Sequence, residues 1–199
     1  FKDQLQVDVK VNFSGKRKGV RTGPDADLEE VEEITPDRLT KRMLWRVAQS
    51  QYDPLGLLSV YTIKFKLLMR NLTQENGKVS AWDDEVPEQV KEEFKAMMED
   101  MSELRSIVFP RSFQPPSSAG EPAGRPMLMM FGDGSREASC ALAYARWPMA
   151  DGSFVCRLIA GKTRVSPKCK ISIPRVELVG ALMAVRLARK IMDSMQKPF

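Results

Sequence analysis

Histidine is absent from the 199-residue sequence, and cysteine occurs only three times. The lack of histidine excludes Ser-His-Asp and Cys-His catalysis, histidine-ligated zinc and histidine general bases. The cysteines, Cys140, Cys156 and Cys169, show no Cys-x-x-Cys spacing. We therefore expect buried, reduced thiols rather than disulfides or metal ligands. Any catalytic chemistry must use carboxylates, lysines, hydroxyls or a bound hard cation.

Long apolar segments are also missing. No run approaches the roughly 18 apolar residues of a membrane span, and the N-terminus does not resemble a signal peptide. We therefore expect a soluble intracellular protein with no membrane partner. The chain starts with Phe1 and ends at Phe199 directly after a helical pattern, which indicates a piece of a longer protein.

Acidic residues are scarce in the C-terminal third. Residues 126–199 contain 12 Lys and Arg against 5 Asp and Glu, whereas residues 1–125 contain 19 against 21. A basic excess of this kind suits contacts with phosphates or another polyanion. A lysine-rich surface without such a partner would give the same counts.

Helical periodicity follows a short N-terminal region, residues 1–35, in which residues 5–11 alternate like a half-exposed strand. A hydroxyl, a proline and an acid at residues 35–37 predict the start of a first helix. A second helix is expected over 57–72, after a Pro/Gly corner, and a third from Pro87. Residues 36–108 are therefore expected to form one helical region.

Strand-like patterns begin after a linker. Residues 109–126 contain five prolines among small residues, which predicts an extended linker at a domain boundary. Short turns between the strands that follow predict an antiparallel meander. The expected strands are residues 127–131, 138–147 and 154–165.

A final helix is expected from Ile173 to about Ser194. Its apolar spacing predicts that Leu178, Leu182 and Val185 form the buried face, with small alanines close to the sheet.

Asp133 comes directly after the first apolar strand, between two glycines. An isolated carboxylate at the end of a buried strand needs a hydrogen bond, a charged partner or a metal ion, although Asp-Gly is also a common hairpin dipeptide. Glu177 is expected in the first turn of the final helix, where it could simply complement the helix dipole. Together, two acids on rigid elements can hold divalent ions that align phosphate and water for hydrolysis.

Three blocks stand out in this C-terminal third: residues 131–135 (FGDGS), 158–167 (LIAGKTRVSP) and 173–181 (IPRVELVGA). Four more occur upstream, at residues 39–42 (LTKR), 52–58 (YDPLGLL), 82–84 (WDD) and 109–111 (FPR). Taken in sequence order, these blocks resemble the BEL/Pao-type retrotransposon polyproteins, in the reverse-transcriptase thumb/connection region and the start of the ribonuclease H domain. The same region also carries the label of a Pao retrotransposon peptidase.

The resemblance implies an α+β chain. Residues 1–35 would be the tail of the reverse-transcriptase region, and residues 36–108 a helical thumb or connection region. After the Pro-rich linker at 109–126, residues 127–199 would form the N-terminal part of a ribonuclease H-like α/β domain, a three-strand antiparallel meander plus a helix. The implied function is to bind template-primer duplex in reverse transcription and to contribute part of a two-metal site that cleaves RNA in RNA/DNA hybrids.

By the same resemblance, Asp133 and Glu177 would be catalytic ligands of Mg²⁺, and Gly134 and Ser135 would approach the phosphates of the nucleic acid. The family site needs further acids on later strands, so we expect this fragment to be inactive alone and Mg²⁺ to bind only in the complete domain. The remainder of the Pol polyprotein would be a partner, in cytoplasmic element particles or in the nucleus.

Two alternatives remain open. One is an aspartic-type peptidase of the Pao family, although such enzymes use Asp-Thr/Ser-Gly and this chain has Asp133-Gly134-Ser135. The other is a catalytically dead module that only binds nucleic acid.

Overall fold

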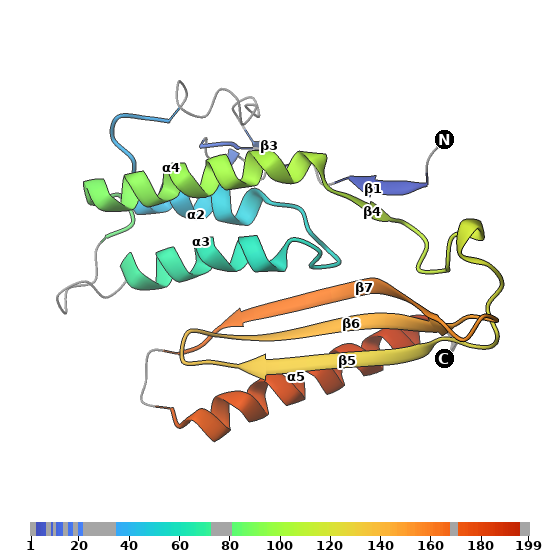
Figure 1. Ribbon diagram of the computed structural model, residues 1–199. Helices are drawn as coiled ribbons and strands as arrows, with labels where there is room; N and C mark the ends of the chain where they lie inside the picture. Colours follow the sequence, from blue (N-terminus) through green and yellow to red (C-terminus); the bar gives the residue numbers. More distant parts are fainter. Residues whose placement is uncertain are drawn as a thin grey trace. The chain divides into compact units, whose positions relative to one another are not determined.

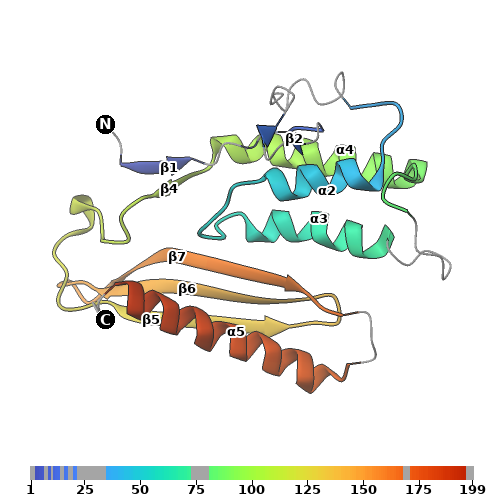
Figure 2. The ribbon, with the colours of Figure 1, turned by 180° about the vertical axis from the view of Figure 1, so that it is seen from behind.

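The computed structural model describes most of the chain, and Figures 1 and 2 show it from opposite sides. Contacts divide the chain into two compact units. The helical unit comprises residues 5–53 and 60–109, and the α/β unit comprises residues 1–4, 54–59 and 110–199. The described residues are 3–6, 9, 11–13, 16–17, 20–21, 35–72, 81–167 and 171–195.

The helical unit is built on α2 (Lys41–Ser50), α3 (Ser59–Leu72) and α4 (Glu88–Glu103), the last extended by the 3-10 turn η3 (Leu104–Ser106). Each helix buries one apolar face, and the rings of Phe65 and Phe94 meet edge to face with centroids 6.1 Å apart. The expected second and third helices are confirmed. The buried side chains of these helices include Leu44, Val47, Phe65, Leu68, Phe94, Met98 and Met101.

Four short strands accompany the helices. β1 (Gln4–Gln6) pairs with β4 (Val108–Pro110), and β2 (Lys16–Arg17) pairs with β3 (Val20–Arg21). The strand expected at 5–11 is thus described only at its start, because residues 7, 8 and 10 lie outside the described part.

The first helix starts later than the sequence predicted. α2 begins at Lys41, and its N-cap is Thr40, whose Oγ1 accepts a hydrogen bond from the backbone N–H of Met43 at 3.4 Å. The preceding residues cannot be helical, because Leu39 accepts a hydrogen bond from Val86 at 3.0 Å and Thr40 forms an antiparallel bridge with Glu85. A tertiary strand-like pairing therefore overrides the helix-start pattern at residues 35–37.

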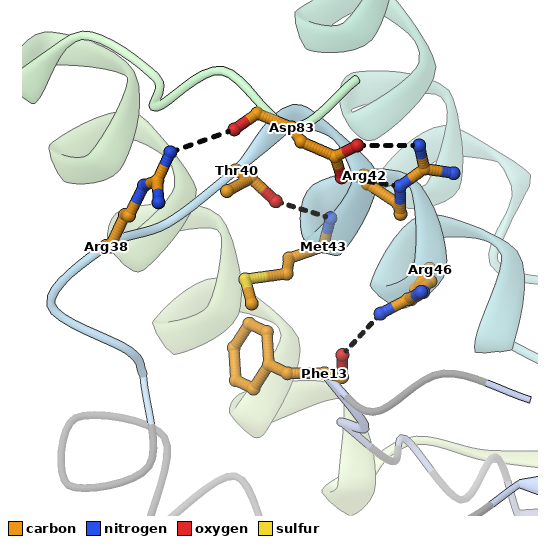
Figure 3. A network of polar contacts seen from close by, with 7 residues as sticks. All are labelled: Phe13, Arg38, Thr40, Arg42, Met43, Arg46 and Asp83. Carbon is orange, nitrogen blue, oxygen red and sulfur yellow. Dashed lines mark hydrogen bonds and ion pairs between the residues drawn. The ribbon is translucent and has the colours of Figure 1, made fainter.

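An arginine clamp fixes the segment before α4 on α2 (Figure 3). Arg42 donates two hydrogen bonds to the Asp83 carboxylate, at 2.7 and 2.9 Å, and Arg38 donates to the Asp83 backbone oxygen at 3.3 Å. Beside the clamp, the rings of Trp45 and Trp82 meet edge to face with centroids 6.0 Å apart. The hydrogen bonds from Arg42 hold the pKa of the Asp83 carboxyl below its ordinary value.

We expect acid to weaken this clamp. The folded-state pKa of Asp83 is lowered, so its contribution to stability is present above the unfolded-state pKa of about 3.9 and is lost as the pH falls through the folded-state value. The effect should be small, because the side chains of Arg42 and Asp83 are 43 and 74% exposed to solvent. Urea midpoints measured from pH 6 downward should fall less steeply below about pH 4 for Asp83→Asn than for the parent. Glu99→Gln, an exposed change on α4, serves as the control and should keep the parent profile.

The α/β unit contains one three-stranded antiparallel sheet in the order β5-β6-β7. Its strands are β5 (Met127–Gly134), β6 (Ala138–Pro148) and β7 (Phe154–Val165), and α5 (Ile173–Ser194) packs on one face. The predicted meander, the final helix and the α+β class are confirmed. β5 runs further than expected, however, since Asp133 pairs with Cys140 within the ladder and is not a turn residue.

The buried face of α5 differs from the prediction. Alanines of β6, Ala141 and Ala143, pack against Met183, Ala184 and Ile191 of the helix. The three residues predicted to be buried, Leu178, Leu182 and Val185, are exposed instead. The helix carries apolar residues on two sides, and the closer approach available at Gly180 decides which side meets the sheet.

The predicted linker is hydrogen-bonded to β6 at Phe113 and Ala123, although it has no core of its own. Trp147 donates its indole N–H to the Phe113 oxygen at 2.8 Å, and Ala123 donates to the Pro148 oxygen at 2.8 Å. The only regular element inside it is the 3-10 turn η4 (Ser117–Ala119), among residues 111–126, all of which the structure describes.

Two further expectations concern side-chain burial and membrane spans. Cys156 is exposed and Cys140 is half-buried, so the prediction of buried thiols is wrong for Cys156, and Cys169 lies outside the described residues. Among the described helices, none has the length and apolar character needed to cross a membrane.

Candidate active site where β5 meets α5

Three glycines allow α5 to approach β5 at backbone distance. A Cβ atom added at Gly132 would lie 2.6 Å from the Gly180 oxygen, and one added at Gly134 would overlap the Val176 carbonyl and lie 2.9 Å from the Glu177 nitrogen. Conversely, a Cβ atom at Gly180 would overlap the carbonyl of Asp133. The backbones of Asp133 and Glu177 are therefore neighbours, although the residues are far apart in the sequence.

The carboxylate of Asp133 is held by its own neighbour. The backbone N–H of Gly134 donates to Asp133 Oδ1 at 2.7 Å, and the side chain is exposed. A hydrogen bond of this kind orients a carboxylate and leaves its other oxygen available.

Strand alternation decides on which side of the sheet each side chain lies. Gly132 and Gly134 face α5, so Asp133 between them leaves β5 on the other face, beside Cys140 of β6. β5 is an edge strand in the described sheet. A metal ion shared by Asp133 and Glu177 would therefore have to lie beyond this outer edge of β5.

Glu177 is not in the first turn of its helix, contrary to the prediction. α5 starts at Ile173 with Ser172 as N-cap, and its first turn contains no acid. The favourable effect of the helix dipole on a carboxylate falls off within the first turn. Dipole complementarity is therefore a poor explanation for Glu177, whose side chain is exposed.

Ser135 closes the hairpin between β5 and β6. Its hydroxyl donates to the Ala138 oxygen at 3.0 Å and accepts from the N–H groups of Glu137 and Ala138, at 3.2 and 3.1 Å. Its backbone oxygen accepts a hydrogen bond at 3.0 Å from the hydroxyl of Ser166, which is buried. The Ser135 hydroxyl is thus engaged within the turn and the Gly134 N–H by the Asp133 carboxylate. A phosphate that took either group would have to replace an existing hydrogen bond.

The donor atoms at this junction suit a hard cation, because carboxylate oxygens are preferred ligands of Mg²⁺. Hydrogen bonds to ligating carboxylates are also typical of metal sites, and Asp133 has one. In the part of the chain that the structure describes, no three His, Cys, Asp or Glu side chains form a group that could hold a metal ion. The junction therefore offers two acids and would need further oxygen ligands.

Most of the chain matches a known protein family. A family model described as the Pao retrotransposon-like RNaseH-like domain matches residues 40–199. The chain belongs to this family. Searches of curated proteins and of solved structures found no match. The resemblance to a Pao-type retrotransposon polyprotein is thereby confirmed.

The family match concerns both units of the chain and bears on function. The matched region covers the helical elements from α2 onward and all of the α/β unit except residues 1–4. An RNaseH-like domain also relates the chain to nucleic acids and to a polyprotein.

Sequence reasoning found the two acids but missed the glycines that bring their backbones together. Gly132 and Gly180 were not predicted to make this contact, because the close approach to the sheet was predicted at the alanines of the final helix. A glycine inside a helix costs about 1 kcal/mol relative to alanine, and its presence at position 180 was the available signal of a close approach.

Proposed function

We propose that this chain supplies part of a ribonuclease H site in a retrotransposon Pol polyprotein. In this proposal Asp133 and Glu177 are two ligands of the Mg²⁺ ions of that site, and the substrate is the RNA strand of an RNA/DNA hybrid. The close packing of Gly134 against Glu177 and of Gly180 against Asp133 carries the proposal. Membership of an RNaseH-like family supports it.

The residues of the junction would act by positioning. The Gly134 N–H orients one oxygen of Asp133, and the glycine contacts hold the backbones of β5 and α5 at a fixed separation. When bound, Mg²⁺ would supply activation of water and neutralisation of phosphate charge.

Binding of template-primer duplex would use the basic residues of the C-terminal third. Lys162 and Arg164 are exposed on β7, and their register partners Ala141 and Ser139 are buried. β7 is separated from β5 by β6, so these cations could neutralise phosphates of a hybrid only at a distance from Asp133.

The first test is Mn²⁺ binding to a form of the polyprotein that extends beyond residue 199, followed by paramagnetic broadening of backbone amide signals. Broadening should be strongest near residues 133 and 177, and either Asp133→Asn or Glu177→Gln should weaken Mn²⁺ affinity at least about tenfold, because each removes a ligand charge. Asp193→Asn is the matched control, since it removes an exposed acid at the other end of α5 and should change nothing. Broadening centred elsewhere would rule out the metal assignment.

The second test measures cleavage in a form of the polyprotein that extends beyond residue 199. Cleavage of an RNA/DNA hybrid should require Mg²⁺ and should fall at least about 100-fold in Asp133→Asn and in Glu177→Gln, equivalent to about 2.7 kcal/mol in the barrier. If both variants cleave as fast as the parent, the proposed roles are wrong. If the parent binds hybrid but never cleaves it, the alternative of a binding module gains support.

The peptidase alternative stays a prediction, and scission of neighbouring polyprotein segments would favour it.

A further inference from the structure

Ser166 is a buried residue at the end of β7 to which the proposed function assigns no role. It is 6% exposed, and it directly follows Val165, the last residue of β7, which pairs with Ala138 of β6. Buried hydroxyl groups are normally hydrogen-bonded. The partner of this hydroxyl lies in the hairpin between β5 and β6, directly beside the candidate site.

Ser166 donates two hydrogen bonds to that hairpin. Its hydroxyl donates to the Ser135 oxygen at 3.0 Å, and its backbone N–H donates to the Glu137 oxygen at 2.8 Å. The β6–β7 ladder ends one residue earlier, at Val165. These two bonds therefore extend the attachment of the hairpin to β7 beyond the regular sheet.

The start of α5 holds the same hairpin from a second side. A Cβ atom at Gly134 would overlap the Val176 carbonyl and lie 2.9 Å from the Glu177 nitrogen. Such packing limits how far the hairpin can move toward the helix but does not orient its peptide groups. The hydrogen bonds from Ser166 supply the orientation, because hydrogen bonds depend steeply on direction.

The hairpin in turn orients Asp133. The Gly134 N–H donates to Asp133 Oδ1 at 2.7 Å, and the next residue, Ser135, is the one whose carbonyl Ser166 holds. A rotation of the peptide groups in the hairpin would move this N–H and, with it, the carboxylate.

Ser166 also stands at the start of the connection to the helix that carries Glu177. Residues 167–171 separate it from Ser172, the N-cap of α5. One buried residue thus attaches both the turn that follows Asp133 and the chain that leads into α5.

We propose that Ser166 is a positioning residue of the metal site, because its hydroxyl fixes the hairpin that orients Asp133 relative to Glu177. This inference rests on the proposed function, since it requires both acids to bind Mg²⁺. Ser166 contacts neither the ion nor the nucleic acid in this role. Without its hydroxyl, the carboxylate of Asp133 is held less firmly in the geometry that a shared ion requires.

The test measures hybrid cleavage against Mg²⁺ concentration in a form of the polyprotein that extends beyond residue 199. Ser166→Ala should raise the Mg²⁺ concentration for half-maximal cleavage at least about tenfold, as is typical when outer partners of metal ligands are lost. At saturating Mg²⁺, the KM for the hybrid should stay within about twofold of the parent, because Ser166 does not bind the hybrid. Ser166→Thr retains the hydroxyl and should keep the Mg²⁺ requirement of the parent.

Thr163→Val is the matched control on the same strand. It removes a half-buried hydroxyl that donates to the Ser59 oxygen at 3.5 Å instead of to the hairpin, and it should keep the Mg²⁺ requirement of the parent. If Ser166→Ala and Thr163→Val lower the urea midpoint alike and neither changes the Mg²⁺ requirement, Ser166 serves stability alone and the proposal is wrong.

Hydrogen exchange in the same protein follows the contact without reference to activity. The Ser135 N–H donates to the Ala138 oxygen at 2.7 Å. Its protection should fall at least about tenfold in Ser166→Ala, because the hairpin opens locally more often, and should persist in Thr163→Val. Unchanged protection in Ser166→Ala would overturn the proposal, whether or not Ser166→Thr folds.

Failure of this inference can be distinguished from failure of the proposed function. If Asp133→Asn abolishes cleavage but Ser166→Ala keeps the Mg²⁺ requirement of the parent, the role of Ser166 is wrong and the metal site stands. If Asp133→Asn cleaves as fast as the parent, the metal site itself is wrong, and the role of Ser166 falls with it.

Discussion

Gly180→Ala should destabilise the α/β unit by about 3 kcal/mol or more, because overpacking of a tight contact costs 1–3 kcal/mol and this contact involves rigid backbone. The added Cβ atom would overlap the carbonyl of Asp133 and lie 2.9 Å from the Asp133 nitrogen. In an isolated helix the same change should stabilise by about 1 kcal/mol, since alanine is the better helix former. The sign of the effect therefore reports whether α5 and β5 touch at this point. Urea unfolding measures it.

Gly134→Ala should have a similar effect from the other side of the contact, because its Cβ atom would overlap the Val176 carbonyl. The control is Gly124→Ala, where the nearest atom to the added carbon is 3.9 Å away, in the Pro148 side chain. This variant should unfold within about 0.5 kcal/mol of the parent. A stabilised Gly180→Ala protein would contradict the packing of α5 on β5.

The elements of the α/β unit could be predicted from the sequence because their local patterns agree with their tertiary environment. β6 alternates between buried alanines and half-buried larger residues, which is the period of a strand with one face packed. Residues 127–131 form an apolar run, and prolines and glycines mark the ends of neighbouring elements. Local and tertiary preferences point the same way in these segments.

Which face of α5 packs on the sheet could not be predicted, because periodicity identifies an apolar face but not the element that it contacts. Leu178, Leu182 and Val185 form the clearer pattern in sequence, yet the sheet packs against the face that contains Gly180 and Ala184. Small residues allow backbones to come close and leave little hydrophobic signal. The predicted start of α2 was wrong for a related reason, since the bridge from Thr40 to Glu85 is a long-range contact.

The candidate site, too, could be predicted from the sequence only in part. Asp133 and Glu177 could be selected through a family resemblance and the chemistry of acids, and the proximity of their backbones follows from glycines whose role sequence alone does not reveal. The engagement of the Ser135 hydroxyl within the hairpin was also invisible, because it depends on the Ala138 oxygen lying at 3.0 Å. Hydrogen bonds of this kind require coordinates.

A glycine pair also attaches residues 54–59 to β7 within the α/β unit. Gly56 has a φ angle of +70°, and its neighbour Leu55 accepts a hydrogen bond from the Gly161 N–H at 2.8 Å. A Cβ atom at Gly56 would overlap the Gly161 carbonyl, and one at Gly161 would lie 2.6 Å from the Gly56 oxygen and 2.9 Å from Ser59 Oγ. The Pro/Gly corner predicted between two helices is therefore also a docking segment for the sheet.

Gly56→Ala should detach this segment. Alanine in the left-handed region costs about 1–2 kcal/mol, and the overlap with Gly161 adds to that, so we expect a total loss of at least about 3 kcal/mol. Gly152→Ala is the control, because Gly152 also has a positive φ of +83° but has no atom within 4 Å of the added carbon. This variant should lose only the stability that a positive φ angle costs alanine, about 1–2 kcal/mol. Hydrogen exchange at the Gly161 amide separates the two variants, since its protection depends on the hydrogen bond to Leu55. Protection should fall in Gly56→Ala and persist in Gly152→Ala. Equal losses of stability with equal protection would show that only the backbone angle matters and that residues 54–59 do not depend on Gly161.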